Sequence, residues 1–242
     1  MKNNFDKVLS FKNVTDNSAD LYFYGDIVSD SWYAWQDEDQ WPEQVKNLLV
    51  GKEGKKLNIY INSCGGSVFA GIAIYNIIKR HTGYKTVYID GIAASIASVI
   101  AFAGDKVVIP SNAFLMIHKP WTNTDGNAND LRKIADTLDV LETSIIDVYK
   151  QNLKDGVDIE TIKQFVNDET WLTGEQAAEY FNVEVSSAKQ MVACVDAAKF
   201  KNAPTNLIIK AENSHEDITA AKLKTTAARI KSLCISGITK GA

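Results

Sequence analysis

The chain has 242 residues, of which 45% are hydrophobic and 23% are charged. This composition is ordinary for a globular protein and argues against global disorder, and the length suits one large domain or one domain with an appendage. The formal net charge of -4 does not favour nucleic-acid binding, because a phosphate-binding surface needs clustered lysine and arginine.

No stretch of the sequence predicts a membrane span or a secretory signal. The longest apolar run, near residues 92–103, is too short and too rich in alanine and serine to cross a bilayer, and residues 1–6 lack the apolar core of a signal peptide. The cysteines, Cys64, Cys194 and Cys234, are widely spaced and form neither a metal-binding pair nor an even disulfide framework. We therefore expect a cytoplasmic protein with no membrane contact, no nucleic-acid partner and no metal.

The hydrophobic pattern in the first two thirds of the chain predicts alternating strands and helices. Residues 1–18 are polar and are expected to form an N-terminal arm, after which alternation and aromatic residues predict a strand over 19–25. Pro42 favours the start of a helix over 43–50. Further strands are expected over 57–61, 86–89, 106–109 and 113–117, with helices over 68–79 and 92–104. Strand-helix-strand units place their strands in parallel, so we expect an α/β fold with a mostly parallel sheet.

A glycine-containing turn joins the strand over 57–61 to the helix over 68–79. Its sequence over 62–67, Asn-Ser-Cys-Gly-Gly-Ser, has neither the G-x-G-x-x-G spacing nor the G-K-[ST] ending of a phosphate cradle. Adjacent glycines can also let a backbone N–H approach a reacting carbonyl group. That second interpretation requires a nucleophile nearby.

Ser95 is the candidate nucleophile, because it lies near the start of the small-residue helix predicted over 92–104. Free N–H groups and the positive end of the helix dipole favour a developing negative charge there. Close packing of small residues is the alternative, and Ser98, one helical turn further, is a substitute nucleophile. His118 ends an apolar strand directly before a Lys-Pro pair, whereas the other two histidines lie in polar segments. A histidine at a strand end can serve as a base or be structural.

Three motifs in this order resemble the ClpP family of serine peptidases. They are Tyr-Ile-Asn-Ser-Cys-Gly-Gly-Ser-Val over 60–68, Gly-Ile-Ala-Ala-Ser-Ile-Ala over 91–97 and Met-Ile-His-Lys-Pro over 116–120. The resemblance covers about residues 19–184, and it implies the ClpP/crotonase-like spiral of βαβ units for that domain. The segment 122–153 resembles the protruding handle of ClpP, with a helix over 130–153 that carries one apolar stripe. An ordinary core-facing helix is the alternative interpretation.

The resemblance also implies roles for single residues. Ser95 matches the family's nucleophile, and His118 matches the general base that takes its proton. Gly66 and Ile96 match the residues whose backbone N–H groups form the oxyanion hole. The family needs no metal or organic cofactor, and none is expected here.

The acid that completes such a triad is where the sequence departs from the family pattern. The family has an aspartate two residues before an aromatic residue, and the corresponding position before Trp171 holds Glu169. A glutamate can orient a histidine as an aspartate does; Asp168 is the substitute candidate, and a solvated acidic loop is the alternative. Cys64 stands where the family usually has proline, as a small turn residue or, alternatively, as a competing nucleophile.

Residues 185–242 extend beyond the resemblance, with helices expected over 186–200 and 217–232 and a short strand over 207–209. This extension resembles those of the ClpP-like head-maturation (prohead) proteases of bacteriophages. The tryptophan-rich segment 32–41 and the Glu-Thr-Trp block at 169–171 share that resemblance. A linker with a partner-docking tail is the alternative.

The function implied by the resemblance is that of a serine endopeptidase acting on polypeptide substrates within homo-oligomeric rings. The expected partners are capsid or scaffold proteins, or an AAA+ unfoldase, in the host cytoplasm or in the prohead. Two alternatives stay open. One is a crotonase-like acyl-CoA enzyme that uses the oxyanion hole alone, and the other is a non-catalytic ClpP-fold assembly protein.

Overall fold

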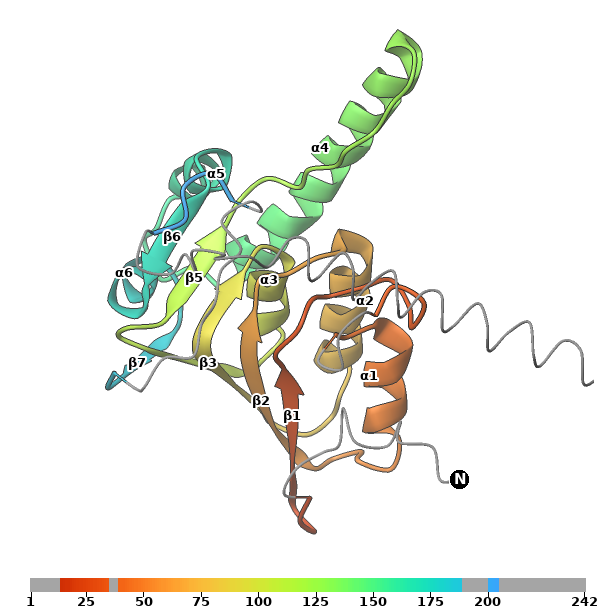
Figure 1. Ribbon diagram of the computed structural model, residues 1–242. Helices are drawn as coiled ribbons and strands as arrows, with labels where there is room; N and C mark the ends of the chain where they lie inside the picture. Colours follow the sequence, from red (N-terminus) through yellow and green to blue (C-terminus); the bar gives the residue numbers. More distant parts are fainter. Residues whose placement is uncertain (1–13, 35–38, 189–199, 205–242) are drawn as a thin grey trace, which may run out of the picture.

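The computed structural model describes residues 14–34, 39–188 and 200–204, and Figure 1 shows their arrangement. The strands are β1 (Ser18–Phe23), β2 (Lys56–Ser63), β3 (Lys85–Ala94), β4 (Lys106–Pro110), β5 (Phe114–Ile117), β6 (Thr170–Thr173) and β7 (Glu184–Ser186). The helices are α1 (Pro42–Leu49), α2 (Val68–Lys79), α3 (Ile96–Ala101), α4 (Ala128–Gln151), α5 (Ile159–Asn167) and α6 (Gly174–Tyr180).

The strands form one mixed sheet in which the predicted parallel units are confirmed. Its main order is β1-β2-β3-β4-β7, while β5 pairs with β3 and β6 pairs with β5. Every pairing is parallel except that of β5 with β6. The helices α1, α2 and α3 lie on one face of this sheet (Figure 1). The chain is therefore an α/β protein whose parallel strands point their carboxyl ends toward one edge.

The two faces of the sheet differ in how they are covered. In β2, Leu57, Ile59 and Ile61 are fully buried beneath the helices. The intervening positions turn to the opposite face, where Tyr60 stacks between Tyr22 of β1 and Tyr88 of β3. This period of two is what a strand with one core face requires.

The helix predicted over 92–104 is wrong at its beginning. Residues as far as Ala94 continue β3 and pair with β5, Ile92 opposite Phe114 and Ala94 opposite Met116. Small side chains suit a helix in isolation, but here they let a strand lie buried between neighbours on both faces. The helix α3 is correspondingly short, and Ser95 lies at the junction between strand and helix.

Three further elements, α5, β6 and β7, are not predicted from the sequence, and β6 and β7 are too short to form a periodic pattern. β6 runs antiparallel to β5, with Ile117 opposite Thr170. The residues that precede β6 therefore lie next to the residues that follow β5, which brings the 168–169 pair beside His118.

The observed elements after β5 can be compared with the predicted segments. Figure 1 shows α4, predicted over 130–153, extending away from the sheet with the chain after β5 running along it. β7 spans the predicted domain end at residue 184, pairing with β4. Most of the helix expected over 186–200, the strand over 207–209, the helix over 217–232 and most of the N-terminal arm lie outside the described residues.

Within the described ranges, no helix is both long enough and apolar enough to cross a membrane.

Candidate active site

Ser95 occupies a sharp turn between β3 and α3. Its φ of 56° and ψ of -129° are uncommon for a residue with a side chain, and such strained conformations cluster at functional sites. The N–H of Ser95 donates to the carbonyl of Met116 at 3.0 Å, which ties the turn to β5. The turn directs the hydroxyl away from the strand and toward the end of β5, where His118 lies.

His118 follows β5 and meets Ser95 directly. Its Nε2 is 2.7 Å from Ser95 Oγ, so the hydroxyl can donate to the ring when Nδ1 carries the ring proton. The side chain is only 8% exposed. Burial lowers the pKa of His118 below its usual 6.5, while the neighbouring Glu169 carboxylate acts in the opposite direction. The imidazole is therefore held as a neutral base within reach of a hydroxyl.

The two candidate acids are placed differently. Glu169 points its Oε2 toward His118 Nδ1 at 3.9 Å, with its side chain 12% exposed. This separation is longer than a hydrogen bond, although catalytic hydrogen bonds often tighten only when substrate binds. Asp168 instead accepts hydrogen bonds from Gln164 and Asn167 on its own helix. Those bonds lower the pKa of the Asp168 carboxyl, and the geometry brings Glu169, rather than Asp168, to the histidine.

The glycine turn packs against the Ser95 turn. A Cβ at Gly65 would lie 2.7 Å from the carbonyl oxygen of Ala94 and 2.8 Å from Ser95 Cβ, closer than real Cβ contacts, and 3.1 Å from the backbone nitrogen of Ile96. Gly66 has a φ of 146°, and a Cβ there would meet the carbonyl oxygen of Ile27 at 2.1 Å. Bare backbone is therefore required at both positions. The two residues predicted as N–H donors, Gly66 and Ile96, lie on these two contacting turns.

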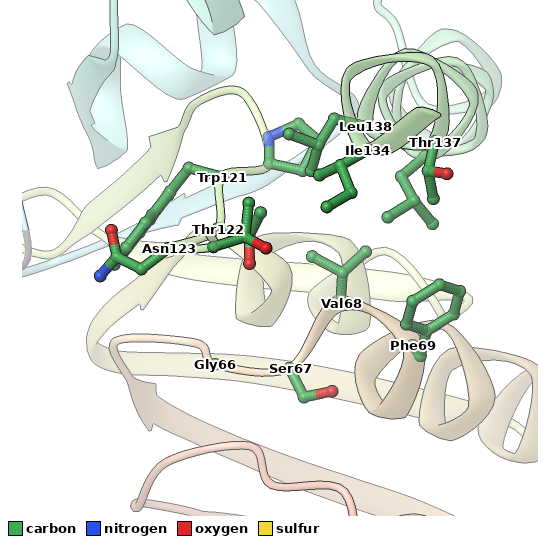
Figure 2. Close-up of a pocket in the computed structure, with 13 residues that line it drawn as sticks. Gly66, Ser67, Val68, Phe69, Trp121, Thr122, Asn123, Ile134, Thr137 and Leu138 are labelled. Carbon is green, nitrogen blue, oxygen red and sulfur yellow. The ribbon is translucent and has the colours of Figure 1, made fainter. Parts of the chain in front are cut away.

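A cavity of about 370 Å³ opens beside the glycine turn. Figure 2 shows it between the turn at Gly66 and Ser67 on one side and α4 on the other, with Ile134 and Leu138 reaching in from the helix. The segment after His118 forms a further wall through Trp121, Thr122 and neighbouring residues. Most of this lining is apolar, which suits the side chain of a bound ligand.

Ser98 is fully buried and supports the Ser95 turn from behind. Its hydroxyl donates to the carbonyl oxygen of Ser95 at 2.5 Å, so the Tyr149 hydroxyl, 2.8 Å away, is the donor in the second bond. Tyr149 lies on α4 and is 1% exposed. Sequence reasoning missed Tyr149, because on the helix it is one more member of the apolar stripe. A chain of two hydrogen bonds therefore links α4 to the strained residue.

We expect Tyr149→Phe to lower the free energy of unfolding by about 1 to 2 kcal/mol, because the Ser98 oxygen would lose a buried donor. The thermal melting temperature, followed by circular dichroism, measures this loss. Tyr75→Phe is the matched control, since Tyr75 is also buried but belongs to α2 and not to α4. Equal melting temperatures for Tyr149→Phe and the unmodified protein would show that the bond contributes nothing.

Comparisons with known proteins agree on one family. The sequence model of the Clp protease family matches residues 12–184. The ATP-dependent Clp protease proteolytic subunit of Ligilactobacillus salivarius is 37% identical over 131 residues, covering 52% of this chain and 64% of the relative. Subunit 1 from Salinibacter ruber is 30% identical, covering 57% and 63%. Subunit 1 from Chlamydia abortus is 30% identical, covering 72% and 82%. The matched part thus spans a little under two thirds of the first two relatives.

Proposed function

The chain belongs to the Clp protease family, and on that basis we propose that it is a serine endopeptidase that cleaves peptide bonds through an acyl-enzyme. The observation that carries this proposal is the 2.7 Å contact between Ser95 Oγ and His118 Nε2, made at a strained turn between strand and helix. A hydroxyl paired with a neutral imidazole in this setting is the arrangement that nucleophilic catalysis requires.

The proposed reaction assigns one step to each group. Ser95 Oγ attacks the substrate carbonyl while His118 accepts its proton, and the imidazolium then returns that proton to the leaving amine. Glu169 orients the ring and stabilises its positive charge. The backbone N–H groups of Gly66 and Ile96 stabilise the negative oxygen of the tetrahedral intermediate. A water molecule, activated by the same histidine, then hydrolyses the acyl-enzyme.

The cavity beside Gly66 supports a preference for an apolar residue next to the cleaved bond. It adjoins the proposed oxyanion hole, and Val68, Ile134 and Leu138 line it. Burying an apolar side chain there would favour its binding by about 1.5 to 3 kcal/mol. The expected substrates are therefore polypeptides with an apolar side chain at that position.

The mode of assembly is part of the same proposal. We propose that βαβ units form the ClpP-type spiral, that α4 is its protruding handle, and that the chain works in homo-oligomeric rings. The exposure of Leu131 and Val140 on α4 supports a contact between copies along that helix.

The extension after residue 184 favours the prohead type, which would act on capsid or scaffold proteins; partnership with an AAA+ unfoldase is the second possibility.

Intact mass spectrometry after treatment with a fluorophosphonate tests the proposed chemistry. We expect one mass addition, mapped by peptide digestion to Ser95, and none when the protein is denatured first. Absence of a label in the assembled protein, together with no cleavage of casein or of capsid proteins, would favour the non-catalytic assembly protein. Turnover of an acyl-CoA thioester by Ser95→Ala would favour the crotonase-like alternative, which the family comparisons do not support.

The rate of labelling should depend on pH through His118. Because His118 must be neutral to accept the Ser95 proton, and burial lowers its pKa below 6.5, the rate should fall as the pH falls, with a midpoint below pH 6.5. The pseudo-first-order labelling rate, measured between about pH 5 and 8, gives the midpoint of this fall. A midpoint above 6.5 would contradict a desolvated histidine as the base.

A further inference from the structure

A segment of the C-terminal extension lies against the candidate site. The ring of Phe200 meets the His118 ring edge-on, with centroids 5.8 Å apart, and the Trp171 ring at 5.4 Å. Phe200 is 8% exposed and packs with Ile92 and Met116, and Ala203 joins the same cluster. These partners occupy the sheet face opposite the main core, where strand ends would otherwise leave an apolar surface in water.

Asn202 makes two polar contacts next to the same site. Its backbone N–H donates to Oε1 of Glu169 at 2.7 Å, and its side-chain amide donates to the carbonyl oxygen of Asp168 at 2.8 Å. The first bond fixes the carboxylate oxygen that does not face His118, because Oε2 is the atom nearest to Nδ1. The second fixes the peptide that leads into Glu169, whose φ of 52° is itself uncommon.

We propose that residues 200–203 form a clamp, built from the extension, that positions the carboxylate of Glu169 and covers one side of the His118 ring. The proposal rests on the proposed function, since it takes Glu169 to be the acid. Asn202 and Phe200 are positioning residues in this scheme, because they act through Glu169 and His118 and touch no reacting atom.

The chemistry of glutamate explains why such a clamp would be needed. A glutamate has one more rotatable bond than the aspartate of the family pattern, and fixing that bond costs conformational entropy. A charge-assisted hydrogen bond from a backbone N–H, which is stronger than a neutral one, holds the carboxylate in one orientation. Among the described residues, the hydrogen bond that anchors the Glu169 carboxylate comes from the extension.

The clamp lies apart from the proposed substrate side chain. The residues that line the cavity beside Gly66 come from the glycine turn, the segment after His118 and α4, and none belongs to residues 200–204. The segment therefore contacts the histidine and the acid while leaving that cavity open. This placement favours a positioning role over a strap that blocks substrate.

Within the part of the chain that the structure describes, the Glu169 carboxylate is the charged group that interacts with the His118 ring. Glu169 faces the ring from the turn before β6. Lys119, next in sequence, pairs with Glu142 of α4, and Asp168 is bound to Gln164 and Asn167. Phe200 brings only apolar atoms, so its removal should let water reach the ring and raise the pKa of His118.

Two pairs of full-length variants test the clamp. Asn202→Pro lacks the backbone N–H, whereas Asn202→Ala keeps it and loses only the side-chain amide. We expect the rate of fluorophosphonate labelling at Ser95 to fall about tenfold more in Asn202→Pro than in Asn202→Ala.

Phe200→Ala should raise the midpoint pH of the His118 ring signal in an NMR titration, and Phe200→Leu should leave it close to that of the unmodified protein. Signals are assigned with His81→Gln and His215→Gln, and melting temperatures show that each variant is folded.

The outcomes separate the two proposals. Equal labelling rates for both Asn202 variants, with an unchanged His118 midpoint in Phe200→Ala, would overturn the clamp. Faster labelling in Asn202→Pro would also overturn it, because the segment would then obstruct the site. If the unmodified protein takes up no label but Phe200→Ala still raises the His118 midpoint, the contact of the clamp stands and the proposed peptidase function fails.

Discussion

Replacing Ser95 with alanine is expected to reduce peptide cleavage to background, a loss on the order of 10⁴ to 10⁶ in rate, because no acyl-enzyme can form without the hydroxyl. The loss should come with unchanged assembly, since Ser95 contributes little buried surface and its backbone turn is held by Met116 and Ser98. Hydrolysis of an unfolded protein such as casein, or of a candidate capsid protein, measures the activity. Size-exclusion chromatography measures the assembly.

Ser98→Ala is the informative comparison for that variant. The Ser98 hydroxyl already donates to the carbonyl of Ser95 and is fully buried, so the label should still appear on Ser95 when Ser98 is removed. Cleavage that survives Ser95→Ala but disappears with Ser98→Ala would reverse the assignment. Cleavage that disappears only with Cys64→Ala would identify the thiol as the nucleophile.

Glu169→Gln is expected to lower the rate of peptide hydrolysis by about 10² to 10⁴, because a neutral amide can neither stabilise the imidazolium nor fix its tautomer. The substitution keeps an oxygen that can accept from the Asn202 N–H, and this orientation turns the amide NH₂ toward His118 Nδ1, so the charge and the acceptor for the Nδ1 proton are lost together. Steady-state kinetics should place the loss in kcat and leave KM nearly unchanged.

Asp168→Asn is the matched control for the acid. The Asp168 carboxylate is exposed and, within the described residues, accepts hydrogen bonds from Gln164 and Asn167, so the activity of this variant should stay within about twofold of that of the unmodified protein. A large loss in Asp168→Asn with full activity in Glu169→Gln would show that Asp168, and not Glu169, is the acid.

The local sequence pattern is sufficient to predict the strands and helices that bury one face. The alternation of β2 and the length of α2 identify a strand and a helix joined by a glycine turn, and parallel pairing follows from that order. The capping box that begins α6, Thr173 followed three residues later by Gln176, is also a local sequence pattern. These features depend on neighbours within a few residues of each other.

The extent of β3 could not be read in the same way. Residues 91–94 have the small side chains of a packed helix, and only their pairing with β5 makes them a strand. The same pairing leaves Ser95 at a turn with positive φ, a conformation that no sequence pattern announces for serine. A strand in the middle of a sheet is stabilised by partners distant in the sequence, so its limits depend on tertiary structure.

The sequence by itself determined the nucleophile and base candidates, because Ser95 and His118 stand in motifs whose residue types and order are specific. For the acid, the motif already favoured Glu169, two residues before Trp171, with Asp168 as the substitute. Tertiary structure then turned the Glu169 carboxylate toward the histidine, because the β5–β6 register brings the residues before β6 beside His118. It also brought Tyr149, Phe200 and Asn202 to the site. Their contacts join residues tens of positions apart, and contacts at that separation leave no local pattern in a single sequence.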